Sequence, residues 1–359
     1  PIVFPRALLL LCLAAPAWTV AAEWQVDATS SRHADALPLN RLDAEDVAGE
    51  FRPRSGRNLA YVRDELRVSR REGASTWSLL ARQNATLVAS EQGLALAHAV
   101  ESEGTPSASR RWNVSAHYLG FAGAGAAWQR QFVIAEGWQG HFGLQGLLLS
   151  QWREHRLEGP AAYDAALQRW QFDLRYHRAD SRLDFPFQDS FAARGQALLT
   201  EGGVAWAEGA WSAGLSWRDA GWLRWRGLPQ QDAVLSTDTQ AVDADGFVEY
   251  KPLVQGRFSQ STLRRTVAGV VRVEAAWAMN AATRWTLAGE RVAGFGWLPQ
   301  LGVKHRWGDV ALAARFDVHE RRLGVAGAWQ GWQLAWGTDR LGGEARSREF
   351  RLGYHWSGI

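Results

Sequence analysis

The chain has 359 residues, of which 47% are hydrophobic and 21% charged, and its mean hydropathy is −0.27. These values exclude a polytopic helical membrane protein, because each spanning helix needs about 20 consecutive apolar residues. They also exclude a disordered chain, since 21 Trp and 14 Phe are far more aromatic side chains than such chains carry. With 40 Lys+Arg against 37 Asp+Glu, the net charge of +3 is too even for a dedicated nucleic-acid binder, and no nucleic-acid partner is predicted.

The N-terminal segment has the parts of a secretory signal peptide. Arg6 precedes the apolar run 7–15, Pro16 interrupts that run, and residues 20–22 are small. A positive residue, a short apolar core and a small-residue site are the three parts that a signal peptidase substrate needs. We therefore expect residues 1–22 to be a cleaved signal peptide and the mature chain to be exported.

Cysteine usage narrows the chemistry. The single cysteine, Cys12, lies inside the predicted signal peptide, so the mature chain has no thiol. This excludes disulfides, haem attachment through Cys-x-x-Cys, iron–sulfur clusters and thiolate zinc sites. No cofactor is predicted.

Residues 23–58 have no clear periodicity. The stretch 32–50 is polar and acidic, and residues 52–56 form a turn cluster. We expect an irregular lead-in, and the sequence leaves open whether it is a periplasmic extension, a plug or an irregular first strand.

From residue 59 to residue 359 the dominant pattern is alternation. In residues 169–177, Trp170, Phe172, Leu174 and Tyr176 alternate with polar side chains. Residues 211–218, 310–319 and 349–356 show the same period of two. Because successive side chains of a strand face opposite ways, each segment has one apolar and one polar face, which helical spacing does not give.

Glycine-containing turns separate these segments, as antiparallel hairpins require. We count roughly 16 strands, with 14 to 18 as the range, and no helical second domain. Strands of about 9–11 residues with one arginine-rich face fit a transmembrane barrel better than a soluble β fold. The expected fold class is therefore all-β, a transmembrane antiparallel up-and-down β-barrel over residues 59–359.

Tryptophan placement favours the same class. An indole ring has an apolar body and one N–H donor, so it settles where lipid meets water. Thirteen tryptophans fall at or near predicted strand ends, and we interpret them as an interfacial girdle: Trp77, Trp112, Trp128, Trp138, Trp152, Trp170, Trp217, Trp222, Trp285, Trp307, Trp329, Trp332 and Trp356.

The last strand carries a resemblance. Its outward ladder would be Phe350, Leu352, Tyr354 and Trp356, and it follows cysteine-free alternating strands and a signal peptide. Together these features resemble the porin-like outer-membrane β-barrels of Gram-negative bacteria. The resemblance implies a place in the cell outer membrane, contact with its lipid, and recognition of the terminal ladder by the barrel-assembly machinery. Residues 357–359 extend beyond the aromatic that ends the strand in that class.

We find no motif for catalysis. There is no Gly-x-Ser-x-Gly nucleophile elbow, and the nine His include no His-x-x-x-His pair. Asp173 with His177, and Asp317 with His319, share strand faces with arginines. We interpret both pairs as parts of a charged lumen wall, and we expect neither an enzyme nor a metal protein.

The predicted function is a pore or translocation channel for small polar or anionic solutes. The alternatives are a barrel-rim hydrolase acting on lipid or protein, and a non-conducting structural or adhesion barrel. Rings of arginine favour anions in pores, so a weak anion preference is expected. The sequence does not fix the oligomeric state. The predicted pore-lining residues are Arg67, Arg169, Asp173, Arg175, His177, Arg218, Arg315, Asp317, His319 and Arg351.

Overall fold

The computed structural model describes residues 22–42, 51–100, 106–183, 195–238, 240–242, 248–250 and 252–357. The predicted signal peptide thus lies outside the described residues, apart from Ala22. Among the described helices, none has the length and apolar character that would let it cross a membrane.

The described chain is almost entirely β-strand. In chain order the elements are β1 (Glu23–Ala34), the short 3-10 helix η3 (Leu39–Arg41), β2 (Arg57–Glu72), β3 (Ser75–Ser90), α1 (Glu91–His98), β4 (Arg110–Ala135), β5 (Trp138–Asp164), β6 (Arg169–Asp180), β7 (Gly195–Glu208), β8 (Trp211–Ser236), β9 (Gln240–Val242), β10 (Val248–Tyr250), β11 (Val254–Val267), β12 (Val270–Ala278), β13 (Thr283–Val292), β14 (Gly296–Trp307), β15 (Val310–Asp317), β16 (Arg322–Trp329), β17 (Trp332–Thr338) and β18 (Ser347–Ser357).

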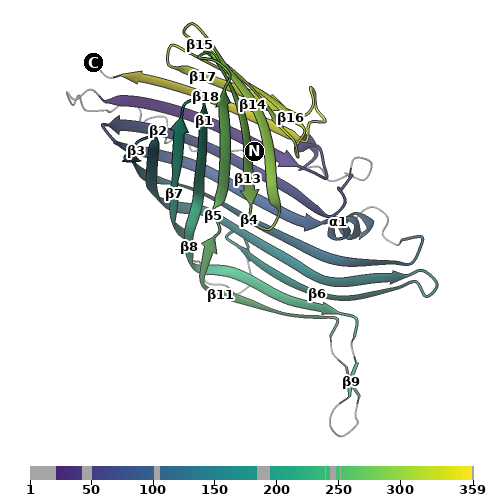
Figure 1. Cartoon of the computed structure of the whole chain (residues 1–359). Coiled ribbons are helices and arrows are strands. Elements are labelled where there is room, and N and C mark those ends of the chain that lie inside the picture. Colours follow the sequence, from purple (N-terminus) through teal and green to yellow (C-terminus); the bar gives the residue numbers. More distant parts are fainter. Residues whose placement is uncertain are drawn as a thin grey trace.

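Within the described residues, fourteen strands close into a ring of antiparallel neighbours (Figure 1). The ring runs β1, β2, β3, β4, β5, β7, β8 and then β12 to β18. It closes where β18 pairs with β1, from Glu23 opposite Ser357 to His33 opposite Ser347. The predicted all-β antiparallel barrel is confirmed, and fourteen is the lower limit of the expected range. Two further strands, β6 and β11, join the same sheet outside the ring.

The first third of the predicted lead-in, residues 23–58, is a strand. Residues 23–34 form β1, which pairs with β18 on one side and β2 on the other. Of the three alternatives that the sequence left open, a first strand is the one found. The pairing satisfies every backbone group of β1 in the ring, and therefore this polar stretch needs no strong hydrophobic pattern to become a strand.

The two ends of the barrel differ in their connections. Both described chain ends lie at one end, which we call the terminal end, together with turns of two residues at 73–74, 136–137, 209–210, 308–309 and 330–331. The connection 279–282 at that end has four residues. At the opposite end, which we call the loop end, β1 is joined to β2 by residues 35–56 and β3 to β4 by residues 91–109. The longest connections therefore all lie at the loop end, although residues 293–295 and 318–321 there make connections of only three and four residues.

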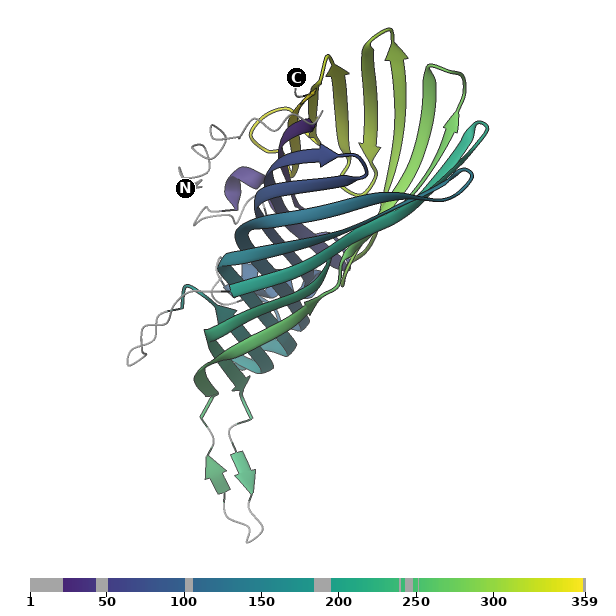
Figure 2. The ribbon, with the colours of Figure 1, turned by 90° about the vertical axis from the view of Figure 1, so that its left-hand side faces the viewer.

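The barrel wall has unequal height (Figure 2). Strands β4, β5 and β8 have 26, 27 and 26 residues, whereas β15, β16 and β17 have 8, 8 and 7. Beyond the ring, the long strands pair with β6 and β11 and form what we call the tall wall, at the loop end. The wall is tall because β8 pairs with β12 near its start and with β11 over the rest of its length.

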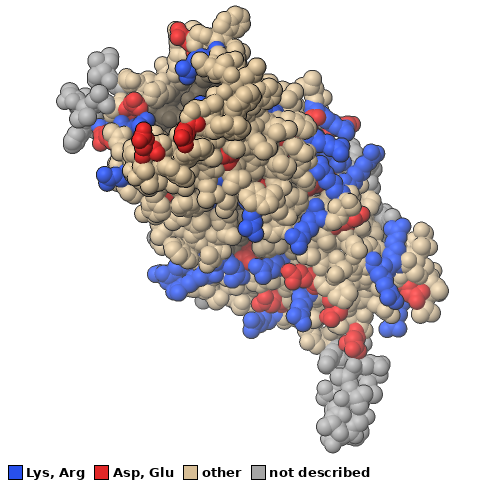
Figure 3. Space-filling view, viewed as in Figure 1, with Lys and Arg blue, Asp and Glu red and all other residues tan. Residues whose placement is uncertain are grey.

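The outer surface of the ring is apolar. Leucines on successive strands point outward, among them Leu144, Leu215, Leu287, Leu312 and Leu334, each exposed by between 37% and 57%. The middle of the face seen in Figure 3 carries few charged side chains, whereas arginines gather over its lower part. Patches of exposed apolar area this extended mark a surface that water does not cover.

Tryptophans ring the terminal end. Cross-strand pairs join neighbouring strands there: Trp24 with Trp356, Trp77 with Trp128, Trp138 with Trp206, Trp211 with Trp277, and Trp329 with Trp332. We call this set the aromatic girdle. Five tryptophans predicted for it lie elsewhere. Trp112 and Trp152 are 6% and 0% exposed, and Trp170 packs against a buried cluster. Trp217 lines an interior cavity, and Trp222 lies further along β8, opposite Leu198.

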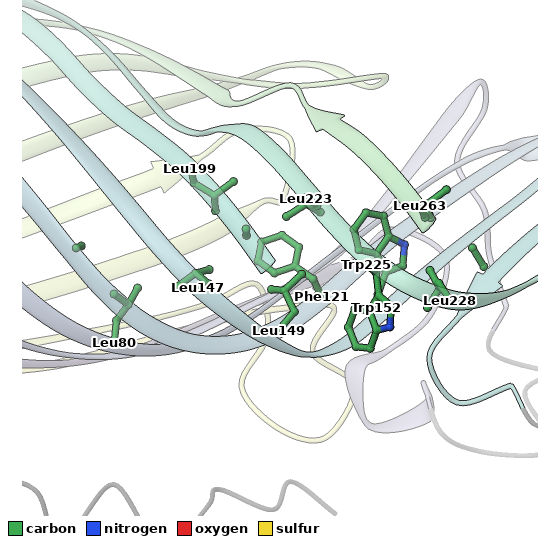
Figure 4. Close-up of a cluster of buried hydrophobic side chains, with 13 residues drawn as sticks. Leu80, Phe121, Leu147, Leu149, Trp152, Leu199, Leu223, Trp225, Leu228 and Leu263 are labelled. Carbon is green, nitrogen blue, oxygen red and sulfur yellow. The ribbon is translucent and has the colours of Figure 1, made fainter. Parts of the chain in front are cut away.

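Buried apolar side chains fill part of the interior of the ring. One cluster joins side chains of β3, β4, β5, β7, β8 and β11, including Leu80, Leu199 and the fully buried Trp152 and Trp225 (Figure 4). Trp225 fits because residue 195 is glycine, where a Cβ would lie 2.3 Å from the indole ring. The interior on this side is therefore filled by side chains and not by water.

A second cluster corrects the predicted facing of residues 169–177. Leu174 is 8% exposed and packs with Leu96 of α1 and with Trp112 and Tyr163. In a transmembrane barrel the apolar face of β6 would meet lipid, but here it packs in a buried cluster with residues of α1, β4 and β5 on the tall wall. The polar face of β6 is the exposed one.

Candidate functional site

Two polar cavities occupy the interior of the ring, with volumes of about 510 and 540 Å³. They share part of their lining, which includes Thr29, Arg63, Gln129 and Arg218. We call the two together the lumen. Figure 3 shows the molecule hollowed at its upper end, near the tips of β15 and β17.

The structure places four of the predicted pore-lining residues in the lumen. Arg67, Arg218 and Arg351 line both cavities, and Arg315 lines the second. Asp317 is 2% exposed and lies beside Arg315. These residues come from four different strands, β2, β8, β15 and β18, whose inward positions the alternation predicts.

The other predicted residues lie away from the lumen. Arg175 and His177 line a separate cavity of about 510 Å³ on the tall wall, where His177 Nδ1 is 2.7 Å from Asp232. Arg169 and Asp173 are exposed on β6 and line neither lumen cavity. His319 lies at the rim of the loop end.

Each of the four lumen arginines has a carboxylate partner. Arg67 Nε is 2.8 Å from Glu65, and Arg351 Nη2 is 3.0 Å from Asp27. Arg315 Nε is 3.1 Å from Asp317, and Arg218 Nη2 is 2.9 Å from Glu290. The wall is thus close to neutral along its length.

One ion pair crosses the lumen. Arg63 Nη1 on β2 lies 2.5 Å from Glu290 on β13, and Arg218 of β8 binds the other oxygen of the same carboxylate. The side chains of Arg63 and Glu290 are only 16% and 10% exposed. Arg63 and Glu290 did not emerge from the sequence as site residues. Their inward positions are consistent with the alternation, but nothing in it indicates that they meet.

A second bridge narrows the space beside the filled side of the barrel. Arg82 of β3 donates two hydrogen bonds to Asp219 of β8, of 2.6 and 2.9 Å. The same arginine donates to Gln145, which in turn donates to Glu201 over 2.7 Å. Bidentate Arg–carboxylate pairs hold both partners in one geometry, and this bridge therefore fixes the width of the lumen here.

Further contacts join strands across the loop end of the interior. The hydroxyl of Tyr61 donates to Glu320 over 2.7 Å, and Arg322 lies 3.1 Å from the same carboxylate. Beside them Leu59 packs with Val292 and Leu298. Polar and apolar contacts together join β2 to the turns of β13–β14 and β15–β16.

The terminal ladder lies on the outer face of β18. Phe350, Leu352, Tyr354 and Trp356 are exposed by 42, 39, 37 and 36%. The ring of Trp356 stacks on Trp24 at a centroid distance of 6.3 Å. The role of this ladder in assembly stays a prediction.

Comparison with known proteins gives distant likenesses only. No protein-family model matches the chain, and no curated protein matches it. Among solved structures it is similar to a mutant of the monoaromatic hydrocarbon channel TodX, with 8% identity, 95% of this chain and 91% of that chain covered, and a TM-score of 0.44. It is also similar to the Ralstonia pickettii toluene transporter TbuX, with 6% identity, 95% of this chain and 90% of that chain covered, and a TM-score of 0.35. A third similar structure is a mutant of the Rh. blastica porin, with 9% identity, 94% of this chain and 99% of that chain covered, and a TM-score of 0.27. At these TM-scores the likenesses carry no argument about the solute.

Proposed function

We propose that the chain is an outer-membrane channel for small polar solutes. The observation that carries this proposal is a closed antiparallel ring with leucines outside and two polar cavities inside. In lipid every backbone polar group needs a partner, and a closed ring supplies one without exposing an edge. An apolar outside around a polar inside is the surface pattern of a membrane barrel and the reverse of a soluble one.

The lengths of the connections at the two ends support one orientation, because the terminal end has only connections of two or four residues. Bacterial outer-membrane barrels place short turns toward the periplasm and long loops outside the cell. The terminal end with its aromatic girdle would then lie at the periplasmic face, and the tall wall would project from the cell surface. The sequence-based signal peptide and terminal ladder fit export and insertion by the assembly machinery.

The charge pairing bears on the solute class. Unpaired arginines would favour anions, but the lumen arginines described above each have an acidic neighbour. We therefore propose polar solutes of either charge, with an anion preference weaker than the arginine content alone suggests.

The cross-lumen contacts support a narrow conformation. Arg63–Glu290 and Arg82–Asp219 lie in the path between the two ends of the ring. Passage would require solutes to move around these pairs or the pairs to part. This predicts small unitary currents in the wild type.

Single-channel recording in planar bilayers tests the proposal. The purified chain should give small, discrete conductance steps, and a variant with both Arg63→Ala and Glu290→Ala should give larger ones. A protein that is folded by its heat-modifiable migration, yet silent in both forms, would contradict a channel and favour a structural barrel.

A further inference from the structure

Two histidines and one aspartate meet at the rim of the loop end. His33 is the penultimate residue of β1, Asp35 is the first residue after the strand, and His319 lies in the turn between β15 and β16. The Nε2 atoms of His33 and His319 each lie 3.1 Å from Oδ1 of Asp35. One ligand atom from each of the three side chains fits within a span of 4.8 Å. We call these residues the rim triad.

The fold holds the rim triad rigidly. Asp35 accepts a hydrogen bond of 2.8 Å from the backbone N–H of Leu59, and its own N–H donates to the carbonyl of the same residue. The side chains of His33 and Asp35 are 1% and 0% exposed, whereas that of His319 is 19% exposed. Asp35 is therefore a ligand held in place before any ion arrives.

The donor set suits one class of cation. Imidazole nitrogen and carboxylate oxygen are the ligands of zinc and its transition-metal neighbours, whereas magnesium and calcium prefer oxygen alone. Around a tetrahedral ion with bonds of about 2.0–2.1 Å, neighbouring ligand atoms lie about 3.3 Å apart. The two 3.1 Å separations are close to that value. Three protein ligands would leave a fourth position open.

Arg54 now occupies the solvent side of the rim triad. Its Nε lies 3.1 Å from Oδ1 of Asp35, and its Nη1 lies 3.3 Å from Nε2 of His319. The same guanidinium donates to the carbonyl of His319 over 2.8 Å. Its side chain is 34% exposed, so it can move outward into water. A guanidinium and a divalent cation cannot both neutralise this one carboxylate at these distances.

We propose that the rim triad is a binding site for a zinc-class divalent cation, which competes with the Arg54 guanidinium. Binding of the ion replaces the contact that ties residues 51–56 to the β15–β16 turn. The Nδ1 atom of His33 is buried without a hydrogen-bond partner among the described residues, so no contact there fixes which ring nitrogen carries the proton and Nε2 can bind the ion. The site depends only on the rim geometry and not on whether the barrel conducts.

Zinc titration by calorimetry tests this site. Tag-free, folded full-length chain is stripped with a chelator and titrated with zinc chloride in excess magnesium. One zinc per chain is expected. His33→Ala and His319→Ala should each weaken binding at least tenfold, because even the loss of an outer-shell partner costs about 10–100-fold. The matched control is His305→Ala, at the other end of the barrel, where Nδ1 contacts only Thr283 over 2.9 Å; its affinity should equal that of the wild type.

The Arg54→Gln variant separates this proposal from adventitious binding. It removes no ligand but removes the competing cation, and it should bind zinc several-fold more tightly than the wild type. Cobalt(II) in the same variant should give the intense visible absorption of a tetrahedral site. Equal affinity in Arg54→Gln and wild type would overturn the competition with Arg54. No binding in either form, or undiminished binding in both histidine variants, would overturn the site itself.

Discussion

Arg63 and Glu290 form an ion pair although their strands lie opposite each other in the ring. Seven steps around the fourteen strands separate β2 from β13 in either direction. Strands about 4.8 Å apart would make a circular ring of this number more than roughly 20 Å wide. An arginine and a glutamate cannot span that width, so the barrel is flattened where the pair forms. The lumen is a slot and not a round pore.

Glu290→Gln should turn this slot toward anions. The change leaves Arg63 and Arg218 facing each other without their shared carboxylate, and an unpaired arginine pair attracts anions. The reversal potential in a salt gradient should move toward the chloride potential. Glu344→Gln, in an exposed pair with Arg340 outside the lumen, is the control and should leave it unchanged. A shift toward cations would contradict the placement of Glu290.

Leu334→Arg and Gln333→Arg test which face of β17 meets lipid. Leu334 is 53% exposed on the outer surface, and Gln333 lies on the opposite face, beside Gly353, which itself lies next to the lumen residue Asp27. A charge on the lipid face near the bilayer centre costs roughly 2–4 kcal/mol, whereas a lumen position tolerates it. Urea unfolding in lipid vesicles should show a large loss of stability for the first variant and little for the second. Equal losses would mean that the faces are wrongly assigned.

Trp225→Ala should destabilise the protein by about 3–5 kcal/mol, as removal of a buried aromatic side chain does. Trp225 is fully buried against β7, whereas Trp222, three residues earlier on the same strand, is 59% exposed. Trp222→Ala is therefore the control and should change stability far less. The free energy of unfolding from denaturant titration decides between them.

Trp356→Ala should lower the yield of folded barrel. The ring of Trp356 contacts both Trp24 and Tyr354, so the change weakens the strand that closes the ring. Heat-modifiable migration of the membrane fraction reports the folded share. Ser357→Ala, one residue on, should leave that share at the wild-type level. An unaltered yield for both would remove the assembly role from Trp356.

The period of two identified strands reliably, but it did not identify what each face meets. In β15 the predicted apolar face is exposed, with Leu312 at 47% and Phe316 at 41%. In β6 the same pattern is buried, because Leu174 belongs to a cluster that includes Leu96 of α1 and Trp112 of β4. A strand face that contacts lipid and one that packs against protein both carry apolar side chains, and therefore alternation alone cannot distinguish the two environments.

β1 shows the opposite failure. Trp24, Val26 and Ala28 alternate with Gln25 and Asp27, a short signal that could have indicated the strand. Its second half is Ser, Arg and His, and the pattern fades there. Backbone pairing with both β2 and β18 stabilises the strand where its side-chain pattern gives no signal.

The lumen was predictable in its residue types and not in its contacts. Inward arginines such as Arg67 and Arg315 follow from alternation, and the structure places both in the lumen. The partners of Arg63 and of His33 lie 227 and 286 positions further along the chain, at Glu290 and His319. Such contacts depend on the register between paired strands and on the flattening of the ring, neither of which can be predicted from a single sequence.

The seam between β1 and β18 sets the order in which this chain can fold. Eleven residue pairs join its first strand to its last, so ring closure has the longest sequence separation in the molecule. Contacts of that kind form late and slowly. Until β18 pairs with it, β1 has an unpaired edge. Another extended chain could pair with that edge and start an aggregate. The slow step of folding should therefore be the joining of the two terminal strands, whatever the order of the hairpins between them.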